Sequence, residues 1–157
     1  MSKEAPVAEG RIHEFKTNSS ADTVEVGRKL VSLLVPPQLL ILRGDLGTGK
    51  TTLVKGIAQA LDAAEPDEVT SPTFTLLHEY DGTREGRPLK LFHLDVYRLE
   101  GERQLDSLGL DELVTPDALV LVEWGEKFKS IRKKATGEIA ITSAGGDARK
   151  ITVTLKD

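Results

Sequence analysis

The segment Gly44–Thr51 reads GDLGTGKT and fits the spacing G-x-x-x-x-G-K-[ST], which constrains the local fold more than any other part of the chain. The apolar run Gln38–Arg43 before it predicts a buried strand, and Thr52–Leu61 after it has the spacing of a helix. Glycine lets the backbone N–H groups of such a loop approach an anion closely, and the N-terminus of the next helix adds favourable partial charge. The segment therefore predicts a strand–loop–helix unit that binds phosphate groups, a P-loop.

The side chains of this P-loop fit a nucleotide together with a divalent ion. Lys50 supplies a mobile point charge for the outer phosphates, and the hydroxyl of Thr51 is a suitable ligand for Mg²⁺. Guanine specificity usually requires an N-K-x-D segment, and the only asparagine is Asn18, so the sequence favours ATP. We expect contacts with the nucleotide along the whole loop and the first helical turn, at Gly44, Asp45, Leu46, Gly47, Thr48, Gly49, Lys50, Thr51 and Thr52.

A chain of 157 residues has the length of one domain with an ordinary hydrophobic core. Its net charge of −4 argues against a dedicated nucleic-acid binder, and its lack of cysteine excludes disulfides, thiolate zinc sites and cysteine nucleophiles. The N-terminal segment lacks the apolar core of a signal peptide, and no apolar stretch is long enough to span a membrane. We therefore expect a cytoplasmic protein without a membrane partner.

Caps, turns and apolar periodicity predict a disordered tail at 1–10 followed by a single domain at 11–157. Asn18–Ser20 supplies caps for a helix to about Leu34, with a capping box of Ser19 and Asp22 or of Asp22 and Glu25. Strands are expected at Arg11–Thr17, Thr73–Tyr80, Leu89–Asp95, Ala118–Glu123, Glu138–Thr142 and Lys150–Lys156, with one or two short helices at Glu100–Val114.

Two pairs of these strands are expected to form antiparallel hairpins, one around the turn Asp81–Arg87 and one around Ala144–Gly146. The nearly continuous apolar run Ala118–Glu123 is typical of a central strand that is buried on both faces. The predicted fold class is therefore α/β, a three-layer P-loop NTPase-like domain with a mixed parallel and antiparallel central sheet.

Two acidic residues at the ends of apolar strands are candidates for the second half of the site. A P-loop usually works with a carboxylate near the metal ion. Glu123 is the candidate metal ligand, although an ordinary charge at the rim of the sheet would look the same. Asp95 could bind the metal through water or orient an attacking water, or it could be a structural cap or a partner of Arg98. His93 lies on the same strand face as Asp95, and we interpret it as a structural group.

Further features adjoin these acids in the sequence. The segment Thr70–Phe74 (TSPTF) fits either a switch that senses a terminal phosphate or a turn before a strand. Trp124, the only tryptophan, follows Glu123 and is either a packed aromatic or a reporter of the site. Arg98 and Arg103 are the nearest candidates for stabilising negative charge in a transition state.

Five segments together resemble the TsaE family, the small P-loop ATPases of bacterial tRNA threonylcarbamoyladenosine synthesis. They are GDLGTGKTT (44–52), SPTF (71–74), HLDVYRL (93–99), GLDEL (109–113) and LVEWGEK (121–127). They occur in the order and spacing of that family, and SPTF, H-x-D-x-Y-R and E-W in combination are specific to it. The chain departs slightly at Thr48, where the family usually carries alanine.

The resemblance implies an enzyme that binds and hydrolyses ATP with Mg²⁺. It implies work with TsaD and its scaffold TsaB, which install threonylcarbamoyl on the adenosine beside the anticodon, so that tRNA is reached through the complex. In this family the ATPase is expected to drive a conformational cycle. The implied catalytic residues are Lys50 on the phosphates, Glu123 with Thr51 on Mg²⁺, and Asp95 in hydrolysis; Trp124 would line the site, and the segment from Ser20 to Thr23 would approach the base.

Positive charge concentrates after the candidate metal ligand, at Lys127, Lys129, Arg132, Lys133 and Lys134. Such a run is most often a solvated face. The alternative is contact with an acidic patch of a partner or with tRNA phosphates, which would weaken as salt rises.

Two other functions stay open from the residues. One is a small-molecule kinase in which Asp95 is the base and Arg98 contacts the acceptor. The other is an interaction module that binds a nucleotide without hydrolysing it. Release of inorganic phosphate on addition of the partner proteins would distinguish an ATPase from both.

Overall fold

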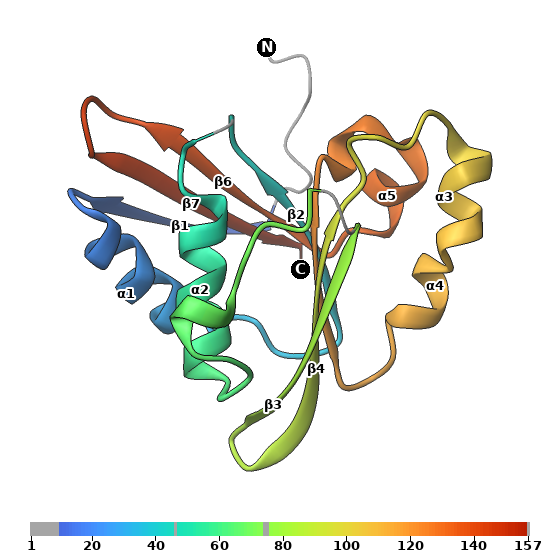
Figure 1. Cartoon of the computed structure of the whole chain (residues 1–157), viewed down its shortest axis with the longest axis horizontal. Coiled ribbons are helices and arrows are strands. Elements are labelled where there is room, and N and C mark those ends of the chain that lie inside the picture. The colour runs from blue at the N-terminus through green and yellow to red at the C-terminus, as the bar shows by residue number, and fades with distance from the viewer. Residues whose placement is uncertain (1–9, 46, 74–75, 157) are drawn as a thin grey trace.

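The computed structural model describes residues 10–45, 47–73 and 76–156, whose strands form one seven-stranded sheet (Figure 1). Its order is β1-β7-β6-β2-β5-β4-β3. The central strands β6, β2, β5 and β4 run parallel, and the remaining pairs are antiparallel, so the predicted mixed sheet is confirmed. The strands are β1 (Gly10–Thr17), β2 (Gln38–Arg43), β3 (Leu77–Arg84), β4 (Arg87–Asp95), β5 (Ala118–Glu123), β6 (Gly137–Ser143) and β7 (Arg149–Lys156).

Helices cover both faces of the sheet and give the three layers that the sequence predicts (Figure 1). Helices α1 and α2 lie on one face, and α3, α4 and α5 lie on the other. The helices are α1 (Ser20–Leu30), α2 (Lys50–Ala60), α3 (Glu102–Leu108), α4 (Leu110–Leu113) and α5 (Lys129–Lys134), with short 3₁₀ turns at Pro66–Glu68 and Gly125–Lys127.

The alternation of side chains along the central strands divides the core into two clusters. Leu40 and Leu42 of β2 pack toward α1 and α2, whereas Leu39 and Ile41 pack toward the other helices. All residues of β5 are buried, as expected for a central strand of a parallel group. Burial on both faces fixes the position of the carboxyl ends of β2 and β5, where the candidate site lies.

Helices α1 and α2 contact each other through glycines. A Cβ atom at Gly27 would clash with the carbonyl oxygen of Leu53, and a Cβ at Gly56 would clash with that of Val24. This close approach excludes larger side chains at both positions. It places Leu53 and Gly56 of α2, which follow the P-loop, against Val24 and Gly27 in the middle of α1.

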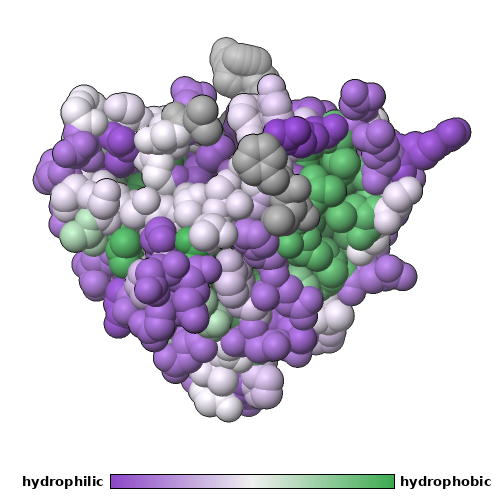
Figure 2. Space-filling model, in the orientation of Figure 1, coloured by the Kyte–Doolittle hydropathy of each residue, from purple (hydrophilic) through white to green (hydrophobic). Residues whose placement is uncertain are grey.

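An apolar area marks the face shown in Figure 2, on the side of the molecule where α3 and α4 lie. Partly buried apolar side chains that pack against the second core cluster include Leu77, Leu99 and Leu108. Within the described part of the chain, no helix is long and apolar enough to cross a membrane.

Several predicted boundaries differ from the structure. Helix α1 ends at Leu30, because the next residues bond with i→i−3 geometry (Leu33 N–H to Leu30 O, 2.8 Å) and reach Leu34 as a turn. Strand β3 begins at Leu77 instead of Thr73, and the first hairpin turn is shorter than Asp81–Arg87, because Arg84 already pairs with Arg87. Of the predicted tail, residues 1–9 lie outside the described residues, and Gly10 already belongs to β1.

Helix α5 is not predicted by the sequence analysis. Its segment is short and dominated by lysine and arginine, which resembles a solvated loop. Ile131 is nevertheless fully buried, and Phe128, directly before the helix, is nearly so. These two apolar anchors attach α5 to the second core cluster.

Candidate active site

The candidate site lies at the carboxyl ends of the adjacent parallel strands β2, β5 and β4, the usual location of ligands in open α/β sheets. In this register Glu123 at the end of β5 is directly opposite Asp95 at the end of β4. A cleft of about 600 Å³ opens there, lined by Gly47, Gly49, Lys50, Thr51, Thr52, Ser71, Thr73, Asp95, Tyr97, Arg98, Glu123 and Trp124.

A larger cavity, of about 820 Å³, lies at the opposite, amino ends of these strands, between Val35, Arg87 and Pro116. It contains none of the residues that the sequence analysis selects. The smaller cleft is the candidate active site because the P-loop and both predicted acids meet in it.

The P-loop has the backbone that its glycines permit. Gly47 and Gly49 have φ values of 82° and 110°, a region that side chains other than glycine rarely adopt. Thr48 closes the loop, because its N–H and its hydroxyl both donate to the carbonyl oxygen of Asp45, at 3.2 and 2.7 Å. The hydroxyl bond is one that alanine could not make. Leu46, also predicted to contact the nucleotide, lies outside the described residues.

Helix α2 begins directly after this loop. Its first intrahelical bond runs from the Leu53 N–H to Gly49 O, at 2.9 Å. The N–H groups of Lys50, Thr51 and Thr52 therefore precede the hydrogen-bonded ladder, and all three residues line the cleft. N–H groups at a helix N-terminus favour anions, so the predicted phosphate contacts would lie at this turn.

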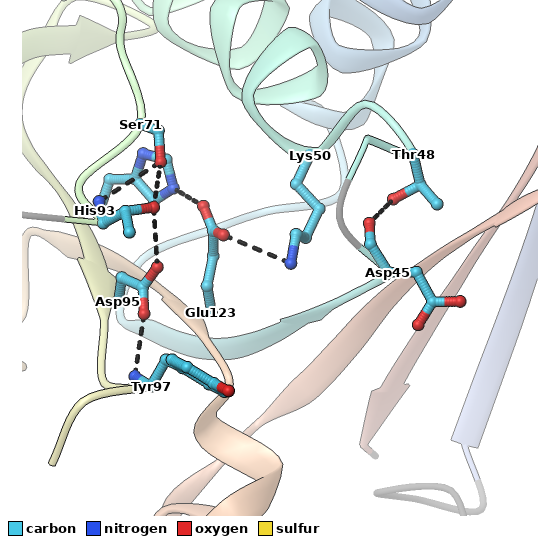
Figure 3. Close-up of polar contacts among 9 residues, drawn as sticks. Asp45, Thr48, Lys50, Ser71, His93, Asp95, Tyr97 and Glu123 are labelled. Atoms are coloured by element: carbon cyan, nitrogen blue, oxygen red, sulfur yellow. Dashed lines mark hydrogen bonds and ion pairs between the residues drawn. The ribbon is translucent and has the colours of Figure 1, made fainter.

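Glu123 connects the P-loop to the sheet (Figure 3). One carboxylate oxygen lies 3.4 Å from Lys50 Nζ, and the other lies 2.6 Å from His93 Nε2. Burial of the Glu123 carboxyl tends to raise its pKa, but the hydrogen bond from His93 and the charges of His93 and Lys50 outweigh burial, so the pKa is lowered. Glu123 is thus a buried carboxylate that is paired with Lys50 and His93, and its role as a metal ligand stays a prediction.

The structure shows which residue His93 contacts, which the sequence analysis does not predict. Its side chain is fully buried, and Nε2 contacts Glu123 from the interior of the sheet. Nδ1 is buried without a hydrogen-bond partner among the described residues. His93 therefore contacts the candidate metal ligand and can orient its carboxylate, and the interpretation of His93 as a structural group stays a prediction.

Asp95 accepts two hydrogen bonds (Figure 3). The Tyr97 N–H donates to Oδ1 at 2.9 Å, and the Thr73 hydroxyl donates to Oδ2 at 3.3 Å. The hydroxyls of Thr73 and Ser71 lie 2.7 Å apart. Asp95 therefore caps the backbone after β4 and also ties the TSPTF segment to the site; Phe74 of that segment lies outside the described residues.

The oxygen ligands expected for Mg²⁺ meet in the same cleft. Thr51 supplies a hydroxyl and Glu123 a carboxylate, and both line it. Among the described residues no group of three or more histidine, cysteine, aspartate or glutamate side chains could hold a metal ion. Mg²⁺ usually takes one or two side-chain oxygens and fills its shell with water and phosphate oxygens.

Aromatic side chains form one wall of the cleft. The Trp124 ring lies 4.9 Å from that of Tyr97, and Lys50 Nζ lies 5.1 Å from the Trp124 ring. Trp124 has a φ of 66°, so the backbone turns sharply directly after Glu123. Tyr97 was missed by the sequence analysis, although its position two residues after Asp95 in the H-x-D-x-Y-R pattern is a signal that could have found it.

The structure places some of the remaining predicted residues at the cleft and others away from it. Arg98 lines the cleft, whereas Arg103 is exposed on α3 and does not line it. Ser20 is exposed in the first turn of α1 and is also not among the residues that line the cleft. Thr23 on the same helix lies near the P-loop, since its Cγ2 would be 3.9 Å from a Cβ at Gly49.

The five basic side chains from Lys127 to Lys134 differ in their contacts. Lys127 donates to the carbonyl oxygens of Tyr97 and Leu99, and Arg132 donates to that of Glu126. Lys134 pairs with Asp111, while Lys129 and Lys133 are exposed.

Arg149, at the start of β7, contacts the backbone of the P-loop from outside the cleft, and the sequence analysis did not select it. Its Nε–H donates to the carbonyl oxygen of Thr48 at 2.7 Å, and Nη2 donates to that of Gly47 at 3.4 Å. No local signal could have found this contact, because 101 residues separate Arg149 from Thr48 in the sequence.

Comparison with known proteins gives one consistent family. The family model "Threonylcarbamoyl adenosine biosynthesis protein TsaE" matches residues 17–151. The chain is 38% identical over 142 residues to the tRNA threonylcarbamoyladenosine biosynthesis protein TsaE of Bacillus subtilis, an alignment that covers 90% of this chain and 84% of that protein. It is 37% identical over 137 residues to the TsaE protein of Treponema pallidum, covering 87% of this chain and 96% of the relative.

A solved structure agrees with these relatives. The crystal structure of YdiB from Bacillus subtilis superposes with a TM-score of 0.65 at 32% sequence identity, covering 94% of this chain and 87% of YdiB. The agreement of sequence and fold over most of the chain confirms the resemblance, and the chain belongs to the TsaE family of threonylcarbamoyl adenosine biosynthesis proteins.

Proposed function

We propose that this chain is a Mg²⁺-dependent cytoplasmic ATPase of tRNA threonylcarbamoyladenosine biosynthesis, which works with TsaB and TsaD and hydrolyses ATP to drive the cycle of that complex. The observation that carries the proposal is the meeting of Lys50 and Glu123 across one cleft, with Lys50 Nζ 3.4 Å from the carboxylate. The P-loop lysine and an acid from a neighbouring strand end are the two parts that P-loop hydrolysis requires. Membership of the TsaE family supports the pathway.

In this proposal the loop and the first turn of α2 bind the phosphates through backbone N–H groups. Lys50, which pairs with Glu123, turns its ammonium group to the outer phosphates when ATP enters. Thr51 and Glu123 would hold Mg²⁺, which would supply positive charge against the phosphates. His93 keeps the Glu123 carboxylate in place from the core side.

Asp95 is proposed to orient the attacking water from the end of β4. Its carboxylate lies directly opposite Glu123 in the strand register, and both residues line the cleft. Two of its acceptor positions are occupied by Tyr97 and Thr73, and a carboxylate has about four, so acceptor capacity for a water is left. Arg98, on the wall of the cleft, is the candidate for transition-state charge.

The test is hydrolysis of ATP by the purified chain with and without the TsaB–TsaD complex, measured as inorganic phosphate in single turnover. We expect slow release by the chain alone and faster release with the complex, because P-loop hydrolysis is slow until a partner completes the site. Lys50→Ala is the inactive control. No release under either condition, with ATP bound, would favour the nucleotide-dependent interaction module.

The same assay examines the kinase alternative, in which Asp95 would deprotonate the hydroxyl of a small acceptor. Products are separated after incubation with γ-labelled ATP and a metabolite extract. Label in inorganic phosphate supports the ATPase, and label in a new small molecule would replace the proposal.

A further inference from the structure

Arg149 joins two segments that are distant in the sequence, the P-loop and the turn before β7. Besides the bonds to Thr48 O and Gly47 O, its Nη1 donates to the carbonyl oxygens of Gly146 and Ala148, both at 2.8 Å. The backbone of Arg149 is itself held in the sheet, because it pairs with Thr17 of β1 and Ser143 of β6. The guanidinium group therefore starts from a fixed base and ends on the P-loop.

The chemistry of these bonds determines what the arginine can do. A guanidinium group has five N–H donors in a planar fork, and here its three nitrogens are all directed at carbonyl oxygens. Arg149 is not among the residues that line the cleft. It is thus unsuited to contact a phosphate and suited to hold the backbone of the loop.

Holding a carbonyl also fixes the N–H of the same peptide unit. In a trans peptide the C=O and N–H bonds point in opposite directions. The carbonyl of Thr48 shares its peptide with the N–H of Gly49, so the 2.7 Å bond to Arg149 turns that N–H away from Arg149. Gly49 lines the cleft, and because glycine has no Cβ its backbone can rotate more freely than that of other residues.

We propose that Arg149 is a positioning residue of the nucleotide site, which fixes the peptide planes of Gly47–Gly49 so that the loop is already arranged for phosphate. The expected effect of Arg149 on ATP binding rests on the proposed function, whereas its expected effect on the loop does not. A loop ordered in advance does not pay its ordering entropy when a nucleotide binds, so affinity rises without any contact between the arginine and the nucleotide.

The first experiment measures the loop without nucleotide, by hydrogen exchange of backbone amides in wild type, Arg149→Gln and Lys150→Gln. Lys150 is the matched control, because it is the next residue of β7, carries the same charge and pairs at the surface with Glu14. We expect peptides covering 44–53 to exchange faster in Arg149→Gln alone, with peptides of β6 unchanged. Unchanged exchange at 44–53, or an equal rise in β6, overturns the proposal.

The second experiment measures ADP affinity with Mg²⁺ by calorimetry in the same proteins. We expect Arg149→Gln to bind at least about tenfold more weakly, equivalent to about 1.4 kcal/mol, and Lys150→Gln to bind as wild type does. Added guanidinium ion at millimolar concentration should restore part of the affinity of Arg149→Ala, because it can occupy the empty donor position. Absence of both the loss and the rescue overturns the role of Arg149 in binding.

The two experiments separate this inference from the proposed function. If wild type binds no nucleotide but the loop exchanges faster in Arg149→Gln, the ATPase proposal fails and the positioning of the loop stands. If wild type binds and hydrolyses ATP while Arg149→Gln matches Lys150→Gln throughout, the ATPase stands and the positioning role fails.

Discussion

The ion pair between Lys50 and Glu123 joins two side chains that need different partners in the proposed reaction. Both are nearly buried, so neither is stable there without a compensating charge. In the proposed reaction, the ammonium group would turn to the phosphates and the carboxylate to Mg²⁺. The pair balances the charge of the cleft, and an exchange of these partners would accompany nucleotide binding.

Glu123→Gln should weaken the dependence on Mg²⁺ of both nucleotide affinity and turnover, because glutamine keeps the volume of the side chain but not its charge. We expect Mg²⁺ to bind at least about tenfold more weakly in the presence of ADP. Calorimetry and turnover are measured over a series of Mg²⁺ concentrations. Glu112→Gln, which removes an exposed carboxylate on α4, is the control. An unchanged Mg²⁺ dependence would place the metal ligand elsewhere.

Asp95→Asn should lower single-turnover hydrolysis with TsaB–TsaD by about 100-fold or more and leave ADP affinity within a few-fold. Asparagine preserves an acceptor for the Tyr97 N–H, so the backbone cap survives while the charge is lost. Thr73→Val removes the other hydrogen bond to Asp95 and keeps the charge, and it should have the smaller effect. Full turnover of Asp95→Asn would leave Asp95 with its cap role alone.

At the scale of elements, short helices are tied to the sheet by a few specific bonds. Helix α5 contacts α3 through Ser130, whose hydroxyl donates to the carboxylate of Glu102 at 2.6 Å. The hydrogen bonds from Ser130 and the nearby charges of Arg132 and Lys134 hold the pKa of Glu102 below its ordinary value of 4.5. The attachment thus depends on a charged carboxylate at the first turn of α3.

Ser130→Ala should move the pKa of Glu102 back up toward its ordinary value, as followed by NMR titration of the carboxyl carbon. The sign for stability follows from the direction of the shift. A lowered pKa contributes stability that is fully present above the ordinary pKa of 4.5 and is lost as the pH falls through the folded value. Wild type should therefore lose more stability on acidification than Ser130→Ala, in which the backbone N–H of residue 130 and the charges of Arg132 and Lys134 remain beside Glu102. An identical titration in both proteins would mean that the bond does not form in solution.

The elements that the sequence predicts best are those whose pattern is local. Strand β2 begins and ends where its apolar run does, β5 is buried throughout, and Ser19 caps α1 by accepting the Asp22 N–H at 3.0 Å. The start of β3 and the length of the first hairpin turn could not be predicted, because strand pairing decides them. The burial of Ile131, invisible among its charged neighbours, likewise decides the existence of α5.

The candidate site likewise contains some features that local sequence patterns predict and others that they do not. The P-loop with Lys50, and the acids at the ends of β4 and β5, follow from patterns within single segments. The contact of His93 with Glu123 depends on the parallel register of β4 and β5, and the contact of Arg149 depends on the position of β7. Such pairings are set by the packed sheet, which a single sequence does not encode in any local pattern.

At the scale of the whole molecule, five basic residues lie between Lys127 and Lys134, although the net charge of the chain is −4. All five members of the basic run are exposed, and three of them bond to backbone carbonyls or to Asp111. Among the described residues, Lys129 and Lys133 are the two members without such a bond, so their ammonium groups are available to a partner.

Lys129→Glu combined with Lys133→Glu should lower the stimulation of hydrolysis by TsaB–TsaD several-fold, while ATP affinity stays unchanged, because neither lysine lines the cleft. The difference should shrink as salt rises, through screening of the charges. Lys16→Glu with Lys156→Glu, on the β1–β7 side of the sheet, controls for net charge. Equal stimulation of both double variants across a salt series would identify the lysines as a solvated face.

The order of strands in the sheet also has a consequence for how the chain folds as it is synthesised. Strands β6 and β7 come after all the other strands in the sequence but lie between β1 and β2 in space. Until the ribosome has released them, β1 has no partner and one edge of β2 is unpaired. The earlier strands can form only a partial sheet, so a cooperative native state has to wait until β6 and β7 have been synthesised. A nascent chain that stalls before β7 would hold a complete P-loop motif on an incomplete scaffold.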